Sequence, residues 1–327
     1  MTCSSCSKEF SNSPTCFDLC VLPSQSIAPP EVGSSVLEAL GELVQRQGGE
    51  GSGKSRAGSY RERNWSVSQL FQSPAISYVY ERGWRQGFEW AGFPGKDEEF
   101  RIMQRLYEDT RVAPRSSSES VLDVSCGTGL FSRKFLRSGM FQSVVASDYS
   151  QNMLDQAFEF LNEREDTKFS METSLTLVRA DVGRLPFQSK SFELVHAGAA
   201  IHCWPTPSMG IAEICRVLKP GGRLIGSTFL LAASPLGQRL GDDSLVKPLF
   251  ELEKEFSGGL MPGLTGRQYR FWSEEELRAL CELCGLENFQ VERDNRFIMF
   301  CATKPLGKKT GVGEDKDAPR PEDYLRD

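Results

Sequence analysis

The stretch that most constrains this chain is Val121–Phe131, which reads VLDVSCGTGLF. An apolar, β-type run is followed by a loop of small residues with two glycines and then by an amphipathic helical segment. A tight strand-to-helix turn of this kind lets a ligand lie against backbone N–H groups at the start of the helix. Asp123 stands near the end of the run, where a carboxylate can accept hydrogen bonds from the loop or from a ligand. Several classes of adenine-containing cofactor use such a turn, so the following segments must distinguish them.

From residue 120 onward, short apolar runs alternate with amphipathic helical segments. Strands are predicted over 121–124, 143–147, 175–179, 192–197 and 223–229, and helices over 130–137, 151–162 and 206–218. Parallel strands joined by crossovers predict an α/β, doubly wound, Rossmann-like sheet. A further helix, capped by Ser273 with Glu276, precedes two closely spaced strands over 288–293 and 297–303. The predicted sheet therefore has seven strands, parallel except for one antiparallel strand of the C-terminal hairpin.

The segments outside this alternation differ in composition. Residues 1–58 are rich in Ser, Gly, Pro and charge, and 306–327 are charged with Gly and Pro, so both are predicted to be mostly disordered. One folded domain is expected over 60–305. Within it, the aromatic-rich segment 60–118 predicts helices that either pack on the domain or form a lid that excludes water. Residues 230–272 interrupt the alternation as an insertion on the substrate side.

Composition and charge exclude several functional classes. The net charge of −6 gives no basic footprint for nucleic acid. The sequence has no run of eighteen apolar residues, so no transmembrane segment is expected. Its N-terminus has neither an apolar signal core nor an Arg-rich presequence. Ten scattered cysteines indicate free thiols in a reducing compartment.

Four cysteines near the N-terminus are candidate zinc ligands. Cys3 and Cys6 have the C-x2-C spacing of half a zinc knuckle, and Cys16 and Cys20 follow with x3 spacing. Four thiolates could form a tetrahedral zinc site. The second pair has an unusual spacing and lacks the turn residues of a knuckle, so we expect no bound metal.

Two acidic residues after neighbouring strands narrow the class of cofactor. Asp148 follows the second strand, beside the glycine loop, where a carboxylate accepts both hydroxyls of a ribose. Asp181 follows the third strand and can accept the amino group of adenine. The loop lacks the third spaced glycine that lets a backbone approach a pyrophosphate. S-adenosylmethionine (SAM) carries no phosphate, so these features favour SAM over NAD.

The segment 120–230 resembles class I SAM-dependent methyltransferases of the type 11 group. The resemblance rests on LDVSCGTG, SDYSQNML, RADVGRLPF, IHCWPTP and EICRVLKPGGRLI. More narrowly, YERGWRQGFEWAGFPG at 80–95, HAGAAIHCWP at 196–205 and FIMFCATKP at 297–305 resemble plant and algal chloroplast methyltransferases of uncharacterised substrate. Those proteins carry two C-x2-C pairs before the lid, of which this chain resembles only the second. The resemblance implies a chloroplast location and peripheral association with plastid lipid particles (plastoglobules), although the chain shows no transit peptide; otherwise a cytoplasmic location is expected.

The resemblance also implies a cofactor site, residue by residue. Its members are Asp123, Ser125, Gly127, Thr128 and Gly129 for the methionine end, Asp148 for the ribose, Tyr149 and Met153 near the adenine, and Asp181 with Val182 for the base itself.

Ser125 departs from the wider family, which has its first glycine at this position. A serine is tolerated there if its φ stays negative, and its hydroxyl can then form a local hydrogen bond. The narrower plant group resembles the serine version, so cofactor binding is expected to be kept.

Few residues are available for acid–base chemistry. SAM is already activated, so in-line positioning and exclusion of water are the main requirements, and a base is needed only if the acceptor must lose a proton. His202 is the candidate base, with a structural hydrogen-bonding role as its alternative. His196 and Trp204 are candidate residues of the acceptor pocket.

The leading hypothesis is methyl transfer from SAM to a small, hydrophobic acceptor such as a quinone or a lipid-like phenol. The alternatives are a SAM-binding or plastoglobule-associated protein without catalysis and, with less support, an NAD-dependent oxidoreductase. Methylation of protein or RNA would need a basic face or an Asn-Pro-Pro-Tyr type motif, whereas the chain has Ala197-Gly-Ala-Ala200 at this place. The sequence carries no prediction of oligomeric state.

Overall fold

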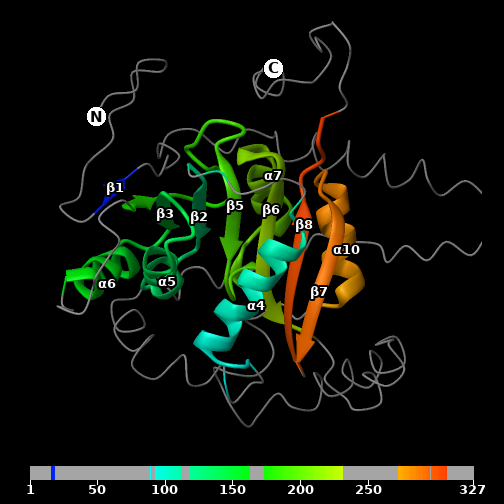
Figure 1. Cartoon of the computed structure of the whole chain (residues 1–327), viewed down its shortest axis with the longest axis horizontal. Coiled ribbons are helices and arrows are strands. Elements are labelled where there is room, and N and C mark those ends of the chain that lie inside the picture. Colours follow the sequence, from blue (N-terminus) through cyan, green and yellow to red (C-terminus); the bar gives the residue numbers. More distant parts are fainter. Residues whose placement is uncertain are drawn as a thin grey trace, which may run out of the picture.

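The computed structural model of this chain describes residues 16–18, 89, 93–111, 116, 118–162, 173–230, 272–294 and 296–307. Its elements, in chain order, are β1 (Phe17–Asp18), α4 (Lys96–Asp109), β2 (Ser120–Val124), α5 (Leu130–Ser138), β3 (Ser143–Asp148), α6 (Gln151–Asn162), β4 (Ser174–Arg179), β5 (Phe192–Ala197), the 3-10 helix η3 (Ile201–Cys203), α7 (Pro207–Val217), β6 (Leu218–Phe229), α10 (Glu274–Leu283), β7 (Glu287–Asp294) and β8 (Phe297–Thr303). The strands form one sheet in the order β1-β4-β3-β2-β5-β6-β8-β7 (Figure 1).

The sheet has the predicted mixed character. Strands β4, β3, β2, β5 and β6 pair in parallel, and β8 runs antiparallel to both of its neighbours, β6 and β7. Only two residues separate β7 from β8 in the sequence, which is too short for a parallel crossover and forces the antiparallel pairing. The α/β, doubly wound fold with one antiparallel C-terminal strand is therefore confirmed.

The order of the strands creates a topological switch point between β2 and β5. From β2 the chain continues outward through β3 to β4, and it then crosses to the other side of β2 for β5 and β6. The connections leave β2 and β5 in opposite directions, which opens a crevice outside their carboxyl ends. Ligands of open α/β sheets bind in such a crevice.

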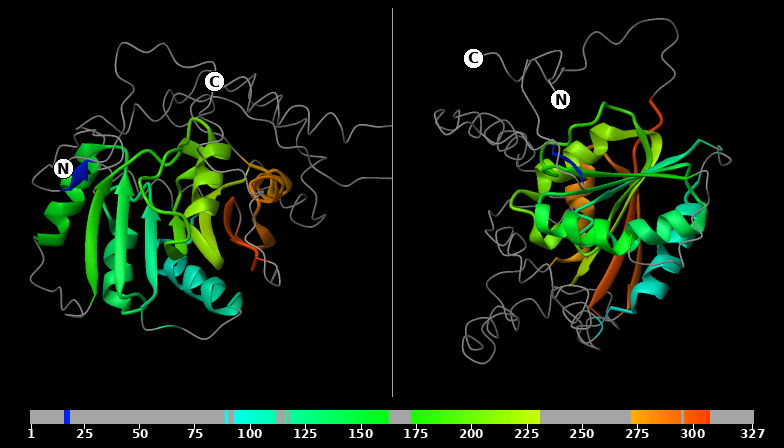
Figure 2. Two further views of the ribbon diagram at one scale, coloured as in Figure 1. Left: turned by 90° about the horizontal axis from the view of Figure 1, so that it is seen from above. Right: turned by 90° about the vertical axis from the view of Figure 1, so that its left-hand side faces the viewer.

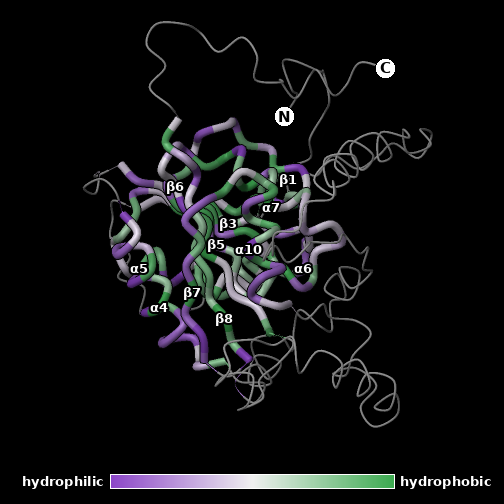
Figure 3. The backbone as a smooth tube through the Cα atoms, turned by 90° about the vertical axis from the view of Figure 1, so that its right-hand side faces the viewer, coloured by the Kyte–Doolittle hydropathy of each residue, from purple (hydrophilic) through white to green (hydrophobic). Residues whose placement is uncertain are grey.

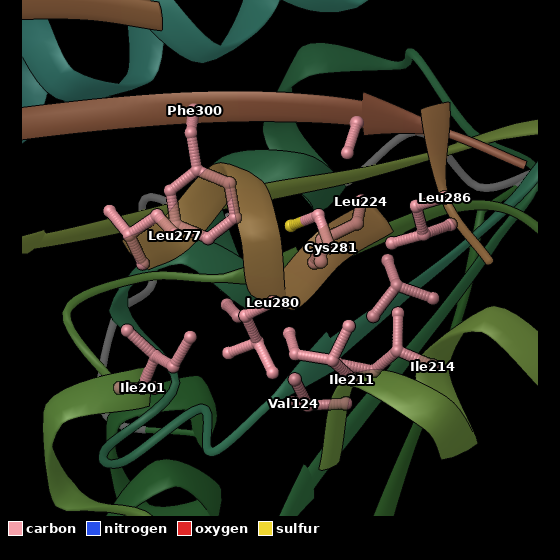
Figure 4. Close-up of a cluster of buried hydrophobic side chains, with 14 of the residues drawn as sticks. Val124, Ile201, Ile211, Ile214, Leu224, Leu277, Leu280, Cys281, Leu286 and Phe300 are labelled. Atoms are coloured by element: carbon pink, nitrogen blue, oxygen red, sulfur yellow. The ribbon is translucent and has the colours of Figure 1, made fainter. Parts of the chain in front are cut away.

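Helices cover both faces of the sheet (Figure 2). Helices α4, α5 and α6 pack on one face, where Phe131 and Phe135 of α5 join the buried side chains of α4 and of the strands. On the other face, Figure 4 shows α10 beside α7, with Leu280 and Cys281 near Ile211. The strands between these layers form the most hydrophobic part of the chain (Figure 3). Strands buried on both faces are rich in apolar residues, and β2 and β5 each supply several buried ones, among them Leu122 and Val195.

Helix boundaries follow local signals in the sequence. The hydroxyl of Ser273 accepts from the N–H of Glu276, and the Glu276 carboxylate accepts from the N–H of Ser273, so the predicted capping box of α10 is present. Gly285 follows the helix with a φ of 84°, which glycine adopts without a steric cost. Helix α6 is capped as well, since Ser150 Oγ accepts from the N–H of Met153.

The start of strand β6 differs from the sequence prediction. Strand β6 begins at Leu218, although 219–222 was expected as the turn between a helix and a strand starting at 223. Leu218 pairs with Phe192, and the register shifts before Leu194 pairs with Arg223. Gly222 makes this irregular pairing possible, because a Cβ there would lie 2.8 Å from the carbonyl oxygen of Lys219.

Strand β1 is an eighth strand in a segment that was expected to be mostly disordered. Phe17 and Asp18 pair in parallel with Val178 and Arg179 at the edge of the sheet. A sheet edge exposes unpaired N–H and C=O groups, and β1 provides partners for part of this edge. The rest of 1–58 and the tail after residue 307 lie outside the described residues, so the predictions for them are not tested.

The lid and the insertion are described only in part. Helix α4 lies in the segment that was predicted to contain helices. Its side chains Phe100, Met103, Leu106 and Tyr107 are buried in the core, so α4 is a packing element. The ends of the insertion meet, because Leu230 and Trp272 form a parallel bridge. The remaining lid and insertion residues lie outside the described part. Among the described helices, none has the length and apolar character needed to cross a membrane.

Candidate functional site

The glycine loop and Asp148 form one hydrogen-bonded unit at the carboxyl ends of β2 and β3. The Asp148 carboxylate accepts from the N–H of Gly127 at 2.9 Å and from the N–H of Ser150 at 2.8 Å. The N–H of Cys126 donates to the carbonyl oxygen of Ser147 at 3.0 Å. Asp148 therefore lies beside the loop as predicted, where its carboxylate can receive the hydroxyls of a ribose.

The environment of Asp148 changes its acidity. Burial raises the pKa of Asp148 from 3.8 to about 6, although the N–H groups of Ser150 and Gly127 partly oppose this shift. A carboxylate with a raised pKa gains from further donors, because each hydrogen bond stabilises the charged form. Ribose hydroxyls would supply such donors.

The glycine loop allows a close approach of helix α6. Gly129 precedes α5 with a φ of 73°, and a Cβ on it would lie 3.1 Å from the Cβ of Ala157 in α6. Arg133 of α5 donates from Nη1 to the carbonyl oxygen of Thr128 at 2.7 Å. These contacts fix the backbone conformation of the loop beside Asp148.

Ser125 corrects the expectation of a negative φ. Its φ is 52°, in the left-handed region that favours glycine, so the chain keeps the backbone conformation of a glycine at this position. The indole N–H of Trp204 donates to Ser125 Oγ at 3.0 Å and holds the residue there. Gly210 of α7 makes room for the indole, because a Cβ at Gly210 would lie 2.8 Å from its ring.

Asp123, which was predicted to hold the methionine end of SAM, is buried and hydrogen-bonded to other side chains of the protein. It is 2% exposed, and its two carboxylate oxygens bind Ser132 Oγ at 2.6 Å and His196 Nδ1 at 2.8 Å. Asp123 and His196 also face each other in the pairing of β2 with β5, at the switch point. The carboxylate thus joins two strands and helix α5, and it fixes the orientation of the His196 ring.

The residues predicted to surround the adenine follow the carboxyl ends of β3 and β4. Asp181 is exposed, and its Oδ1 accepts from the N–H of Gly183 at 2.9 Å, which orders the turn after β4. Val182 is partly buried and packs on the core, and Met153 is buried. The carbonyl oxygen of Tyr149 accepts from Arg179 Nε at 3.0 Å. The sheet brings these residues to one edge, as predicted.

His202 and Trp204 are both buried in the protein interior. His202 is 1% exposed, its Nδ1 lies 3.1 Å from Thr228 Oγ1, and burial lowers its pKa to about 3. This environment favours the structural role over the role of a base. Trp204 is buried with its N–H directed at Ser125, and His196 is enclosed by Phe131 and Phe135. The acceptor-pocket role of His196 and Trp204 stays a prediction, and the structure places His196 beside Asp123 and Trp204 beside Ser125.

The cysteines of the described residues give no nucleophile and no metal cluster. Burial raises the pKa of the Cys126 thiol in the loop and of the Cys203 thiol in η3, which keeps both protonated at neutral pH. Cys16 is buried and its Sγ lies 3.5 Å from Gln151 Oε1. No group of three potential metal ligands occurs in the described ranges, and Cys3, Cys6 and Cys20 lie outside them.

Sequence reasoning missed Ser132, Gly198 and Gly210. Ser132 bonds the carboxylate of Asp123, Gly198 lies against the His196 ring, and Gly210 against the Trp204 ring. Ser132 looks like a helix surface residue in the sequence. Gly210 could have been identified from the sequence, because a glycine within a predicted helix commonly indicates close packing against a neighbouring group.

Comparisons with known proteins show a similarity to methyltransferases. Residues 122–226 match the family model described as a methyltransferase domain. Two uncharacterised chloroplastic methyltransferases of Arabidopsis thaliana are 43% and 44% identical over 75% and 73% of this chain, and the matches cover 62% and 61% of those proteins. The chain therefore spans less than two thirds of the length of these relatives.

More distant comparisons extend the similarity. A demethylmenaquinone methyltransferase of Clavibacter sepedonicus is 32% identical over 44% of this chain and 53% of its own length. The solved structure of phosphoethanolamine N-methyltransferase 2 of Haemonchus contortus, in complex with SAM, has a TM-score of 0.50 and 18% identity, covering 73% of this chain and 60% of that protein. This similarity concerns the fold.

Proposed function

The chain carries a methyltransferase domain over residues 122–226, and from this premise we propose that the protein transfers a methyl group from SAM to a small, hydrophobic acceptor. The main support for this proposal is the position of the Asp148 carboxylate. Its Oδ2 lies 2.9 Å from the backbone nitrogen of Gly127, at the carboxyl edge of the sheet. A carboxylate at this place suits the two hydroxyls of a ribose.

The groups at this edge fit the cofactor in other respects too. The backbone of the loop is fixed by the hydrogen bond from Arg133 to Thr128 and by the close contact of Gly129 with Ala157. Asp181, after β4, lies one strand farther out and suits the amino group of adenine. The loop contains no cationic side chain that would pair with a phosphate. When bound, SAM supplies an activated methyl group on a sulfonium.

The protein residues would then act by orientation and by exclusion of water. The loop and Asp148 would hold the adenosine part against β2 and β3, while buried Trp204 and His202 stabilise the turn after β5 from behind. None of these residues needs to move a proton for the cofactor to bind. Positioning alone can supply a large share of the rate of such a transfer.

The nature of the acceptor is the finer part of this proposal. A quinone-like or lipid-like acceptor is supported by the aromatic content of 60–118 and by the name of the bacterial relative, a demethylmenaquinone methyltransferase. The names of the plant relatives support a plastid location. Peripheral association with plastid lipid particles would bring the enzyme to such acceptors.

The test is incubation of the purified protein with labelled SAM and a plastid lipid extract, followed by mass spectrometry. We expect a lipid-soluble component to gain the label and a net mass of one CH2, because the methyl group replaces a hydrogen. A matched reaction with Asp148→Ala should show much less product. Labelling of water-soluble components only would contradict the hydrophobic acceptor, and SAM binding without any labelled product would contradict catalysis.

A further inference from the structure

One buried nitrogen at the switch point has no role in the site described so far. His196 ends its strand beside Asp123, and its ring is 1% exposed. Among the described residues, Nε2 of this ring is buried without a hydrogen-bond partner. Buried polar atoms are nearly always paired, so an orphan at a ligand crevice points to a missing partner.

The neighbours of His196 decide which nitrogen carries the proton. Nδ1 lies 2.8 Å from Asp123 Oδ1, and the other oxygen of Asp123 accepts from Ser132. A carboxylate accepts hydrogen bonds, so we assign the N–H donor of the ring to Nδ1. With this tautomer the lone pair lies on Nε2, which is an acceptor that requires an N–H or O–H donor.

Two phenylalanine rings pack against the imidazole of His196, and its Cε1–Nε2 edge is directed at Gly198. Phe131 and Phe135 of α5 lie against the imidazole, with centroid distances of 4.7 Å and 5.4 Å. The edge with Cε1 and Nε2 faces Gly198, where a Cβ would lie 2.7 Å and 3.2 Å from these atoms. Gly198 is partly exposed and has no side chain to cover this edge of the ring.

The order of the strands identifies the donor by elimination. Along the carboxyl edge the sequence of strands is β4, β3, β2 and β5. SAM has three kinds of donor: the adenine amino group, the ribose hydroxyls and the α-ammonium. Asp181 after β4 suits the first and Asp148 at the end of β3 suits the second. With the adenine and the ribose at β4 and β3, the methionine end would extend across β2 toward β5, where His196 lies.

We propose that Nε2 of His196 accepts a hydrogen bond from the α-ammonium of the bound cofactor, with Gly198 as the opening through which this contact is made. This inference rests on the proposed function. Asp123 takes part indirectly, because it fixes the tautomer and strengthens Nε2 as an acceptor. His196 is thus a cofactor-binding residue, while Asp123 and Ser132 are positioning residues.

Two ligands distinguish this role from general support of the fold. S-adenosylhomocysteine carries the α-ammonium, whereas 5′-methylthioadenosine has the same adenosine part and lacks the amino-acid end. Calorimetry on the full chain would measure both affinities for the wild type, His196→Phe and His196→Asn. The amide nitrogen of asparagine can still donate to Asp123, but this side chain has no counterpart of Nε2.

We expect both variants to bind S-adenosylhomocysteine about tenfold to a hundredfold more weakly, the range for a hydrogen bond to a charged group. Binding of 5′-methylthioadenosine should stay within about twofold of the wild type. Wild-type affinity of His196→Asn for S-adenosylhomocysteine would overturn the inference, since the ring would then act through Asp123 alone. An equal loss for both ligands would overturn it as well.

A second variant tests the opening without changing the histidine. Gly198→Ala places a methyl group against the Cε1–Nε2 edge and should reproduce the selective loss for S-adenosylhomocysteine. Gly307→Ala is the matched control, because nothing lies within 4 Å of a Cβ there. Unchanged affinity of Gly198→Ala would contradict the proposed opening. A wild-type protein that binds neither ligand would instead overturn the proposed function, so the two failures are distinguishable.

Discussion

The indole N–H of Trp204 donates a hydrogen bond of 3.0 Å to the hydroxyl of Ser125, a serine whose φ is 52°. Left-handed backbone costs a residue with a side chain about 1 kcal/mol or more. The hydrogen bond from Trp204 offsets part of this cost. It also ties the turn after β5 to the glycine loop after β2, across the switch point.

Substitution of Ser125 should separate the two contributions. Ser125→Gly and Ser125→Ala both remove the acceptor of the Trp204 N–H, but only glycine relieves the left-handed backbone. We expect Ser125→Gly to have a free energy of unfolding about 1 kcal/mol higher than Ser125→Ala. Denaturation in urea, followed by circular dichroism, measures both. Equal stabilities would mean that φ relaxes to a negative value in the alanine variant.

Removal of the Asp148 carboxylate should weaken cofactor binding. Asp148→Ala removes the acceptor for both ribose hydroxyls, and we expect SAM to bind about tenfold to a hundredfold more weakly. Isothermal titration calorimetry measures the affinity. Asp97→Ala is a suitable control, since Asp97 is an exposed residue of α4 that pairs with Lys134. Unchanged affinity of Asp148→Ala would remove Asp148 from the site.

The pH dependence of binding should follow the same carboxylate. The pKa of Asp148 is raised to about 6, chiefly by burial, so the group is partly protonated below that pH. A protonated carboxyl accepts the ribose hydroxyls poorly, and affinity for S-adenosylhomocysteine should fall as the pH decreases through about 6. Calorimetry over a pH series measures this, and Asp148→Ala should lack the dependence in this range. A wild-type profile that is flat across pH 6 would contradict the assignment.

The raised pKa of Asp148 also affects folding stability. Its contribution to stability falls as the pH rises, whereas its contribution to cofactor binding increases. Because the folded pKa lies above 3.8, Asp148 favours the folded state fully below about pH 3.8, and this contribution is lost as the pH rises through about 6. Asp148→Asn removes the titrating group. The free energy of unfolding of this variant, minus that of the wild type, should therefore be larger above pH 6 than at pH 4, in the absence of ligand. Urea denaturation at both pH values measures the difference, and a gain that does not grow with pH would contradict this expectation.

His202 should be dispensable for chemistry. Burial lowers its pKa to about 3, and its Nδ1 lies 3.1 Å from Thr228 Oγ1. We expect His202→Gln to keep the affinity for SAM and the rate of methyl transfer, with a loss of stability of about 1–3 kcal/mol from the buried pair. Labelled-methyl assays with the lipid extract compare the rates at equal folded protein. A large loss of rate with intact SAM binding would restore His202 as the base.

The glycine-loop region illustrates how far sequence reasoning reached. The apolar run of β2, the small residues after it and the acidic residues Asp148 and Asp181 are local patterns, and each was found at the expected place. The conformation of Ser125 was predicted wrongly, because its φ depends on Trp204, which is distant in sequence. The enclosure of Asp123 was also missed, since it depends on His196 and Ser132 from two other elements.

By itself the sequence determined the alternation of strands and helices, the caps of α6 and α10, and the line of acidic residues at the carboxyl ends of the strands. These features depend on periodicity and on hydrogen bonds between near neighbours, which are local in the chain. Only the tertiary structure decided that His196 lies on Asp123 at the switch point, with Nε2 facing Gly198. Asp123 and His196 are 73 residues apart in the sequence, and the geometry of their contact is set by the packing of the whole sheet.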